Sequence, residues 1–334
     1  MMTYGIPSFR LEKDVVNAEI EVLRDLGVDI LCGVNVGDDL TLDDLRKEGY
    51  QGFYVAIGAQ GGRKLGVPGE TESHDVLSGI DFLRNVAYNE QPDLPEKVVV
   101  IGSGNVAIDV ARTALRKGGK DITMLCLESR EEMPAAADEV ADTEAEGIKV
   151  ECGWGPKEIK VENGHVTSIV MKRCTRVRDE TGRFNPAYDE NDTMEIPCNA
   201  VLAAIGQSIE WGNLLKGSKV VVGRGGRAEA DSWTYQTAEP DIFVGGDVYT
   251  CPRFLIDAIA AHVDTNICIG CGLCTVQCKF DAIHLTRDYA AFGADYEHLV
   301  PAVLQEMGRK TVLNAAKANA KFIKKRPGWE NIHK

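Results

Sequence analysis

Residues 97–119 read KVVVIGSGNVAIDVARTALRKGG, and this stretch decides the fold class. Val98–Ile101 is a run of apolar residues, which is typical of a strand that is buried on both faces of a parallel sheet. Asn105–Lys117 repeats small and apolar residues at helical spacing, and a second apolar run follows at Ile122–Leu127. The stretch therefore predicts a strand–helix–strand unit of an α/β fold.

The loop between this strand and this helix has the spacing G-x-G-x-x-A. In this context the first glycine permits a tight turn, the second lets the backbone approach a pyrophosphate, and the alanine lets helix and strand pack closely. The helix N-terminus offers unpaired N–H groups and a positive dipole end to phosphates. A tight turn without a ligand is the alternative interpretation. The candidate dinucleotide-binding residues are Gly102, Ser103, Gly104, Asn105, Val106 and Ala107.

Glu128 stands at the end of the second apolar run, where an acidic side chain hydrogen-bonds the ribose 2′-hydroxyl of NAD. The same carboxylate repels the 2′-phosphate of NADP, so the sequence favours NAD(H) over NADP(H). Arg130, two residues further on, is a candidate for contact with a 2′-phosphate and opposes this preference. An ordinary surface glutamate is the alternative interpretation of Glu128.

The remaining sequence continues the α/β pattern around a different middle part. Alternating runs separated by Asn163-Gly164 and Thr181-Gly182 predict a small antiparallel insertion within residues 148–205. Helical spacing and apolar runs predict helices at 14–26, 42–47 and 255–261, and strands at 28–32, 53–57, 200–205 and 242–246.

Four cysteines stand close together in the pattern C-x-x-C-x-x-C-x-x-x-C. This spacing is typical of bacterial ferredoxins, in which thiolates hold an iron–sulfur cluster. Zinc sites more often pair two separated C-x-x-C arms, so zinc is the alternative. The pattern predicts one 4Fe–4S cluster on Cys268, Cys271, Cys274 and Cys278. The scattered cysteines are interpreted as small buried hydrophobic residues: Cys32, Cys126, Cys152, Cys174, Cys198 and Cys251.

The net charge of −14 excludes unselective nucleic-acid binding, which needs a basic face. No run reaches the roughly 18 apolar residues that span a bilayer, and the sequence does not open with a secretory signal pattern. We therefore expect no membrane partner and a cytoplasmic location. Lysine and arginine gather in residues 310–334, which predicts a solvated helix face or, alternatively, a docking surface for an acidic partner.

Together these features resemble the small subunit of glutamate synthase and its flavin-dependent relatives. The resemblance covers roughly residues 1–261 and rests on several motifs in the family's order. They are YGIPSFRLEKDVV (4–16), AIGA (56–59), VVVIGSGNVAIDVART (98–113), SREEMPA (129–135), AAIGQ (203–207) and DIFVGGDVYTCPRFLIDAIAA (241–261). Some relatives also carry a ferredoxin-like tail, which CIGCGLCTVQCKFDAIHL (268–285) resembles.

The resemblance implies two nested Rossmann-like dinucleotide-binding domains and a small C-terminal ferredoxin-like segment. Residues 1–75 and 200–262 would form the FAD-binding domain, and residues 76–199 the inserted NAD(P)H-binding domain with its antiparallel part. Residues 263–290 would hold the cluster, and residues 291–334 would be a basic helical tail. By the same resemblance, the cofactor residues on the flavin side are Gly206, Gly246, Asp247, Arg253 and Ile256.

Two departures from the family pattern bear on the cofactors. The family's FAD motif, G-x-G-x-x-G, lies upstream of the YGIP segment, so we expect the FAD-binding domain of this chain to be incomplete. The family often has paired arginines where this chain has Leu127 and Glu128, which again favours NADH.

The main hypothesis is an NAD(P)H-dependent oxidoreductase that passes electrons between a nicotinamide cofactor, FAD and a 4Fe–4S cluster to a protein or small-molecule acceptor. Hydride transfer needs no acid or base, so the lack of a recognisable catalytic group is compatible with this hypothesis, and the catalytic residues are left unassigned. The alternative is an electron-transfer subunit that needs a partner chain to hold FAD. A regulator that binds NAD or metal without catalysis is a third hypothesis. The expected partner is an electron-transfer protein or a large catalytic subunit, and a hetero-oligomer is one expected assembly.

Overall fold

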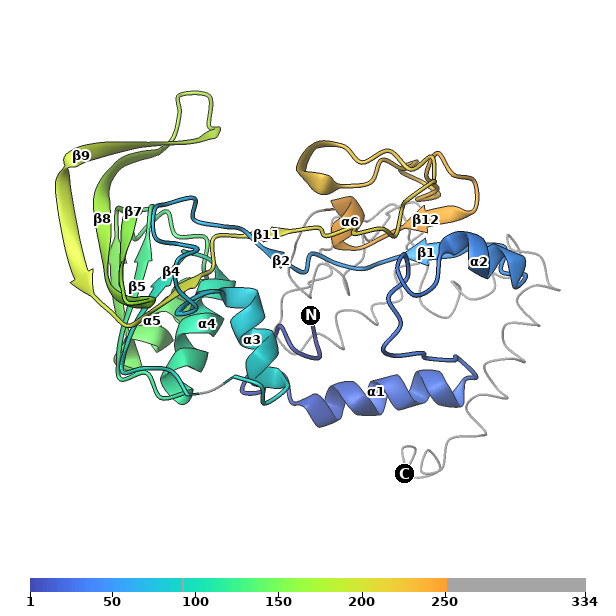
Figure 1. Cartoon of the computed structure of the whole chain (residues 1–334), viewed down its shortest axis with the longest axis horizontal. Helices are drawn as coiled ribbons and strands as arrows, with labels where there is room; N and C mark the ends of the chain where they lie inside the picture. Colours follow the sequence, from blue (N-terminus) through green and yellow to red (C-terminus); the bar gives the residue numbers. More distant parts are fainter. Residues whose placement is uncertain (92, 251–334) are drawn as a thin grey trace, which may run out of the picture. The chain divides into compact units, whose positions relative to one another are not determined.

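A parallel strand–helix–strand unit forms where the sequence predicts it. Strands β4 (Lys97–Ile101) and β5 (Asp121–Cys126) pair in parallel and are joined by α4 (Asn105–Arg116). The computed structural model describes residues 1–91 and 93–250, and this unit lies in a five-stranded parallel sheet (Figure 1). The strand order is β3 (Val76–Ser78), β10 (Ala200–Ala203), β4, β5 and β6 (Lys149–Cys152).

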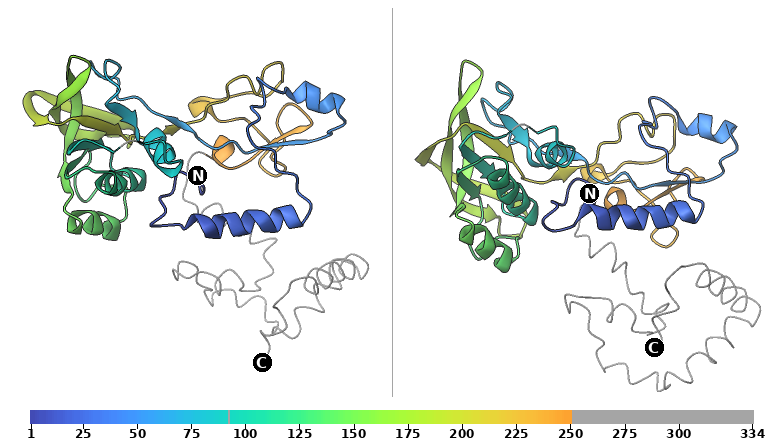
Figure 2. Two further views of the ribbon diagram at one scale, coloured as in Figure 1. Left: turned by 60° about the horizontal axis from the view of Figure 1, so that its bottom comes forward. Right: turned by 90° about the horizontal axis from the view of Figure 1, so that it is seen from below.

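Both faces of this sheet are covered, because each strand alternates its apolar side chains between two cores. Val98 and Val100 face a core that three helices complete. These helices are α3 (Gly79–Ala87), α4 and α5 (Ala137–Ala145). Val99 and Ile101 face a second core, which an antiparallel sheet completes. The result is a layer of helices on one face of the parallel sheet and a second sheet on the other (Figure 2).

The antiparallel sheet consists of three consecutive strands, β7 (Trp154–Glu162), β8 (His165–Arg178) and β9 (Phe184–Pro197). The predicted turn at Asn163 and Gly164 joins the first two strands, and both residues have the positive φ that a tight hairpin requires. Ile159, Val166 and Ile169 are buried in the second core. The insertion therefore shares its core with the parallel sheet.

A third core forms around a separate pair of strands. β1 (Phe53–Val55) and β12 (Ile242–Val244) pair in parallel, and their apolar residues pack with Leu42 and Val248. The remaining elements are α1 (Lys13–Asp25), α2 (Leu42–Lys47), β2 (Gly61–Gly62), β11 (Gln207–Ser208), the short 3-10 helix η1 (Arg224–Gly226) and α6 (Asp247–Thr250). β2 and β11 pair antiparallel. None of the described helices combines the length and apolar content needed to cross a bilayer.

Two expectations from the sequence differ from the structure. The strand predicted at Val28–Cys32 is wrong, because this segment pairs with no strand among the described residues, and Leu31 is 80% exposed. Strand β10 is hydrogen-bonded between β3 and β4, although the sequence analysis assigned residues 200–262 to the flavin-binding part. The helix expected at 255–261 lies outside the described residues.

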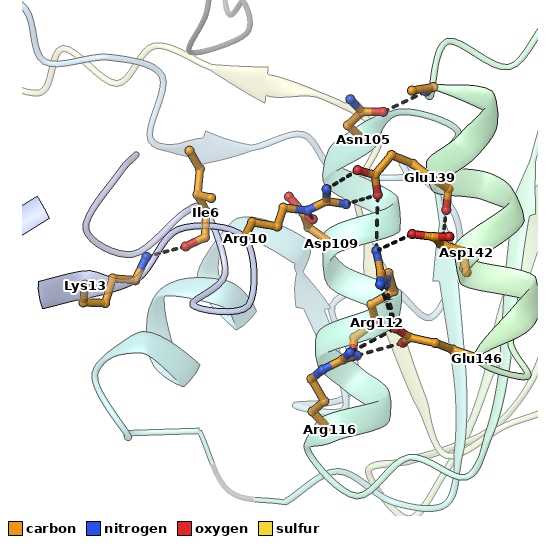
Figure 3. Close-up of polar contacts among 12 residues, drawn as sticks. Ile6, Arg10, Lys13, Asn105, Asp109, Arg112, Arg116, Glu139, Asp142 and Glu146 are labelled. Carbon is orange, nitrogen blue, oxygen red and sulfur yellow. Dashed lines mark hydrogen bonds and ion pairs between the residues drawn. The ribbon is translucent and has the colours of Figure 1, made fainter. Parts of the chain in front are cut away.

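Arg10 fastens the N-terminal segment to α4 and α5 (Figure 3). Its guanidinium pairs with Asp109 on α4 and with both carboxylate oxygens of Glu139 on α5, where Nη2 lies 2.6 Å from Oε2. The neighbouring Phe9 ring lies under the guanidinium groups of Arg112 and Arg116, at 5.2 and 4.4 Å from the ring centre. Ion pairs and cation–π contacts therefore hold a short segment against two helices.

The carboxylates of this cluster differ in pKa. Burial raises the pKa of Asp109 to about 6, and Arg10 offsets only part of this effect. Arg10 lowers the pKa of Glu139, whereas Arg116 and Arg112 lower the pKa of Glu146 on α5 to about 2. Near pH 5, Asp109 is therefore largely protonated and its ion pair with Arg10 is lost, while the other two carboxylates stay ionised.

Replacing Asp109 by asparagine should flatten the pH dependence of stability. The unfolded chain releases the Asp109 proton near pH 3.8, whereas the folded chain holds it until about pH 6, so wild type loses stability as the pH rises through this window. The free energy of unfolding of wild type, relative to Asp109→Asn, should fall by about 1.5 kcal/mol between pH 5 and pH 7.5. Chemical denaturation measures this difference, and parallel curves for the two proteins would contradict it.

Candidate functional site

Gly102 lies where the end of β4 comes close to the chain that leaves β10. Its φ is +149°, and a Cβ at this position would lie 2.4 Å from the carbonyl oxygen of Ala204 and 3.0 Å from the Cβ of Ala107. Ala107, in the first turn of α4, is itself fully buried. Small residues are therefore required at both positions for the chain to turn from β4 into α4.

Gly104 is the N-cap residue of α4 and leaves open space in front of the helix. No atom lies within 4 Å of the position that a Gly104 Cβ would occupy, and no side chain caps this helix end. The N–H groups of Asn105 and Val106 are thus left without a capping side chain in the described part of the chain. Open space and unpaired N–H groups fit the pyrophosphate of a dinucleotide.

The loop before α5 braces the glycine-rich loop. The N–H of Ala135 donates to the carbonyl oxygen of Ser103 at 3.1 Å, and the N–H of Ala136 donates to Oδ1 of Asn105 at 3.1 Å (Figure 3). Val106 packs against the core of the helical layer. The side chains of Asn105 and Val106 therefore contact other parts of the protein, whereas their N–H groups have no capping side chain among the described residues.

Glu128 lies two residues after the end of β5 and is half-buried. Its carbonyl oxygen accepts a hydrogen bond from the N–H of Gly153 at 3.0 Å, and its carboxylate has no ion-pair partner among the described residues. Arg130, in contrast, gives both terminal nitrogens to Glu144 on α5, at 2.9 and 2.5 Å. Arg130 is therefore paired with an acidic side chain, whereas the carboxylate of Glu128 has no basic partner among the described residues.

A cavity of about 480 Å³ opens at the carboxyl ends of β5 and β6, lined by Leu127 and Ser129 on either side of Glu128 in the sequence. Three arginines also line it: Arg130, Arg176 and Arg178. The end of β8 thus brings positive charge to the edge where the ribose of a dinucleotide would lie. Sequence reasoning missed Arg176 and Arg178, because only the packing of β8 onto the parallel sheet reveals their position.

The flavin-side residues Gly246 and Asp247 follow β12, next to the chain that leaves β1. A Cβ at Gly58 would lie 3.8 Å from Oδ2 of Asp247 and 3.9 Å from Nε2 of Gln60. The hydroxyl of Tyr4 donates to Oε1 of Gln60. The Asp247 carboxylate thus lies near Gly58 of the AIGA motif, whereas Tyr4 of the YGIP motif contacts Gln60. The sequence analysis quoted both motifs without assigning them a role.

Gly206 stands in a different loop, between β10 and β11. It has a φ of +117°, and its carbonyl oxygen accepts a hydrogen bond from the N–H of Arg63 at 3.1 Å. Among the described contacts, none joins Gly206 to Gly246 or Asp247.

Several predicted site residues lie outside the described residues: Arg253, Ile256, Cys268, Cys271, Cys274 and Cys278. Within residues 1–91 and 93–250, no group of three or more histidine, cysteine, aspartate or glutamate side chains is placed to hold a metal ion. The predicted cluster site therefore stands on its sequence pattern.

A parallel sheet with a glycine-rich loop in front of an uncapped helix defines a dinucleotide-binding protein. Residues 9–262 match the family described as pyridine nucleotide-disulphide oxidoreductase, and the chain belongs to this family. Residues 261–284 match the 4Fe-4S binding domain, and this range includes all four predicted cluster cysteines.

Named relatives narrow the comparison. The chain is 35% identical over 294 residues to the NADP(+)-dependent formate dehydrogenase subunit beta of Moorella thermoacetica, covering 84% of this chain and 41% of the relative. It is 29% identical over 279 residues to the small chain of NADPH glutamate synthase of Escherichia coli (strain K12), covering 78% and 58%. The chain thus spans less than two thirds of the length of these relatives.

Among solved structures, FprA of Mycobacterium tuberculosis in complex with NADPH aligns with a TM-score of 0.62 at 20% identity, covering 77% of this chain and 71% of that chain. This likeness concerns the fold alone. The comparisons confirm the predicted resemblance to glutamate synthase small subunits, the α/β Rossmann-like fold and the oxidoreductase class. The names of the relatives carry NADP(+) or NADPH, so they do not support the predicted preference for NADH.

Alanine at Gly104 and at Gly102 should separate cofactor binding from folding. A Cβ at Gly104 enters open space, so Gly104→Ala should change the free energy of unfolding by less than about 1 kcal/mol. The same methyl group occupies space that a pyrophosphate needs, and NADH binding should weaken by about tenfold or more.

Gly102→Ala is the matched comparison, and it should lower stability because its Cβ would strike the carbonyl oxygen of Ala204. Calorimetric titration and chemical denaturation of both variants provide the two readouts. An unchanged NADH affinity in Gly104→Ala would contradict the prediction that the pyrophosphate of the cofactor lies against Gly104.

Proposed function

We propose that this chain passes electrons between a nicotinamide dinucleotide, FAD and one 4Fe–4S cluster, and exchanges them with a protein or small-molecule partner. The observation that carries this proposal is the uncapped N-terminus of α4 behind Gly104, at the carboxyl edge of a parallel sheet. The match of residues 261–284 to the 4Fe-4S binding domain supports the cluster.

The described residues have distinct proposed tasks. FAD, when bound, supplies the step between a two-electron hydride donor and a one-electron cluster. The N–H groups of Asn105 and Val106 would hold the pyrophosphate of the nicotinamide cofactor, and Gly104 would let it approach. Asp247, close to Gly58, would accept hydrogen bonds from the polar part of the flavin. No side chain is required as an acid or a base.

We propose a matching division of the chain. Residues 76–203 would bind the nicotinamide cofactor, since the hydrogen bonds of β10 to β3 and β4 favour its inclusion in this part. Residues 1–75 and 204–262 would contribute the flavin side. Residues 263–290 would hold the cluster, and residues 291–334 would form the basic tail.

We also propose that NADH is preferred over NADPH. The uncompensated carboxylate of Glu128 at the end of β5 supports this preference, as does the bidentate pairing of Arg130 with Glu144. Arg176 and Arg178 in the neighbouring cavity are the cations that would favour a 2′-phosphate instead. The names of the relatives favour NADPH, so a direct comparison of the two cofactors is needed.

A protein partner is part of the proposal. One relative is named as a beta subunit and another as a small chain, which supports a hetero-oligomer with a larger catalytic subunit or an electron-transfer protein. The net charge of −14 argues against a nucleic-acid partner. A reducing compartment such as the cytoplasm would keep the cluster cysteines available for iron.

Anaerobic purification followed by a visible spectrum and by iron, sulfide, zinc and flavin counts tests the proposal. We expect about four irons and about four sulfides per chain together with bound FAD. Iron without flavin would favour the alternative, in which a partner chain is needed to hold FAD. Zinc in place of iron would refute the electron-transfer function.

Cys271→Ser should abolish most iron binding, because a cubane cluster needs all four thiolates. Nucleotide affinity should stay unchanged, since the proposed phosphate site is built from α4 and β4. Iron analysis and NADH titration of the same preparation measure both effects, with Cys198→Ser as a control for the loss of a cysteine. Full iron content in Cys271→Ser would show that the cluster is held elsewhere.

Glu128→Arg should reverse or narrow the preference for NADH. The substitution replaces an acid that repels a 2′-phosphate with a cation that attracts it, so the ratio of the NADPH and NADH Kd values should shift by about tenfold or more towards NADPH. Glu131→Arg, on the exposed side of the same turn, is the charge-matched control. Equal affinity of the unmodified protein for both cofactors would rule out the proposed preference.

A further inference from the structure

Two cysteines that are 26 positions apart meet at the carboxyl edge of the parallel sheet. Cys126 is the last residue of β5, Cys152 is the last residue of β6, and the two are register partners. Their Sγ atoms lie 3.7 Å apart. The sequence analysis treated them as separate buried residues, whereas the strand register makes them a thiol pair.

The backbone spacing at this pair suits a disulfide. Neighbouring strands lie about 4.8 Å apart, which falls within the Cα–Cα range of about 4.4–6.8 Å that disulfides span. Register partners on adjacent strands carry their side chains on the same face of the sheet. Rotation of the two side chains can therefore bring the sulfurs together without a shift of either strand.

The two thiols differ in access. Cys126 is 2% exposed, whereas Cys152 is half-buried and lines the cavity at the ends of β5 and β6. Burial raises the pKa of the Cys126 thiol, and Cys152 and Glu128 raise it further. A reagent in the cavity therefore meets Cys152 first, and Cys126 lies behind it as a slower second thiol.

We propose that Cys126 and Cys152 form a reversible oxidation site that reacts with low-molecular-weight disulfides such as glutathione disulfide. The Cys152 thiolate attacks one sulfur of the reagent, whose S–S bond breaks and releases one thiol. The Cys126 sulfur then attacks the Cys152 sulfur of the mixed disulfide, and that bond breaks to release the second thiol. Overall, two electrons and two protons pass from the protein to the reagent, and one protein disulfide forms.

This pair is connected directly to Glu128. The Cys126 thiol lies 3.6 Å from the carbonyl oxygen of Glu128, and Gly153, next to Cys152, donates its N–H to the same oxygen at 3.0 Å. Oxidation removes the hydrogen bond that the Cys126 thiol donates to this oxygen, and with it one of the two contacts that fix the Glu128 turn. Oxidation therefore weakens NADH binding; this consequence rests on the function proposed above, whereas the disulfide itself does not.

The remaining described cysteines supply the competing product and the control. Cys174 lines the same cavity, so a bridge between Cys152 and Cys174 is the competing product. Cys198 is 1% exposed in the second core and is the buried control, whereas Cys32 is exposed and reports that the reagent is active.

The test is a peptide map of the full-length chain with its cluster, incubated anaerobically with glutathione disulfide. Free thiols are blocked at intervals with N-ethylmaleimide, and the digest is analysed by mass spectrometry. We expect linked peptides that contain Cys126 and Cys152, and their loss on addition of dithiothreitol. A link between Cys152 and Cys174 as the main product, or glutathione on Cys32 with no link at Cys126, would overturn the proposal.

Two variants test the order of attack. Cys126→Ala should trap Cys152 as a stable mixed disulfide with glutathione, because the second thiol is missing. Cys152→Ala should leave Cys126 unmodified over the same period, because Cys126 is buried. Glutathione on Cys126 in Cys152→Ala would refute the assigned roles. Circular dichroism checks that both variants are folded. If either variant fails to fold, the wild-type peptide map still tests whether Cys126 and Cys152 form a disulfide.

NADH titration of reduced and oxidised protein tests the coupling. We expect the Kd for NADH to rise at least about fivefold on oxidation and to recover with dithiothreitol, in wild type and Cys198→Ala but not in Cys152→Ala. The cluster absorbance, followed in parallel, shows that the cluster is retained. Equal Kd values would overturn the coupling, whereas no NADH binding by the reduced protein would overturn the proposed function and leave the disulfide result standing.

Discussion

The close approach at Gly102 is the constraint on which the rest of the described site depends. A side chain there would strike the carbonyl oxygen of Ala204, so the chain can turn from β4 into α4 only through glycine. This turn directs the N-terminus of α4 to the edge at which the parallel strands end. Because parallel strands end on the same side, the proposed phosphate site, Glu128 and the cavity share that edge. The helical layer and the antiparallel sheet then bury the two faces behind it.

Much of this fold could be predicted because its signals are local. The apolar run Val98–Ile101, the helical spacing of Asn105–Lys117 and the turn at Asn163-Gly164 each specify their own element, and the structure forms each of them. The strand predicted at Val28–Cys32 does not form, because an apolar run carries no information on whether a neighbouring strand is present to pair with it. Sequence spacing also could not show that β10 inserts between β3 and β4, since that pairing joins segments far apart in the chain.

The candidate site was predicted in part for the same reason. The glycine-rich loop is contiguous, whereas the contacts around it come from register and packing. In the sequence, Glu128 and Arg130 are both candidates for contact with the ribose or its 2′-phosphate. Only the position of α5 shows that Arg130 is paired with Glu144. The meeting of Cys126 with Cys152 follows from both being the last residues of neighbouring strands. The sequence analysis placed residue 152 in the antiparallel insertion, so it could not show this pairing.

The attachment of Phe9 and Arg10 has a consequence for the order in which the chain is assembled. Arg10 finds its partners 99 and 129 positions later, on helices that a ribosome completes on the order of ten seconds after the segment emerges. During that interval the aromatic ring and the guanidinium lack the surface on which they finally rest. This segment is thus synthesised well before the surface on which it docks, and it can dock only after α4 and α5 have been made.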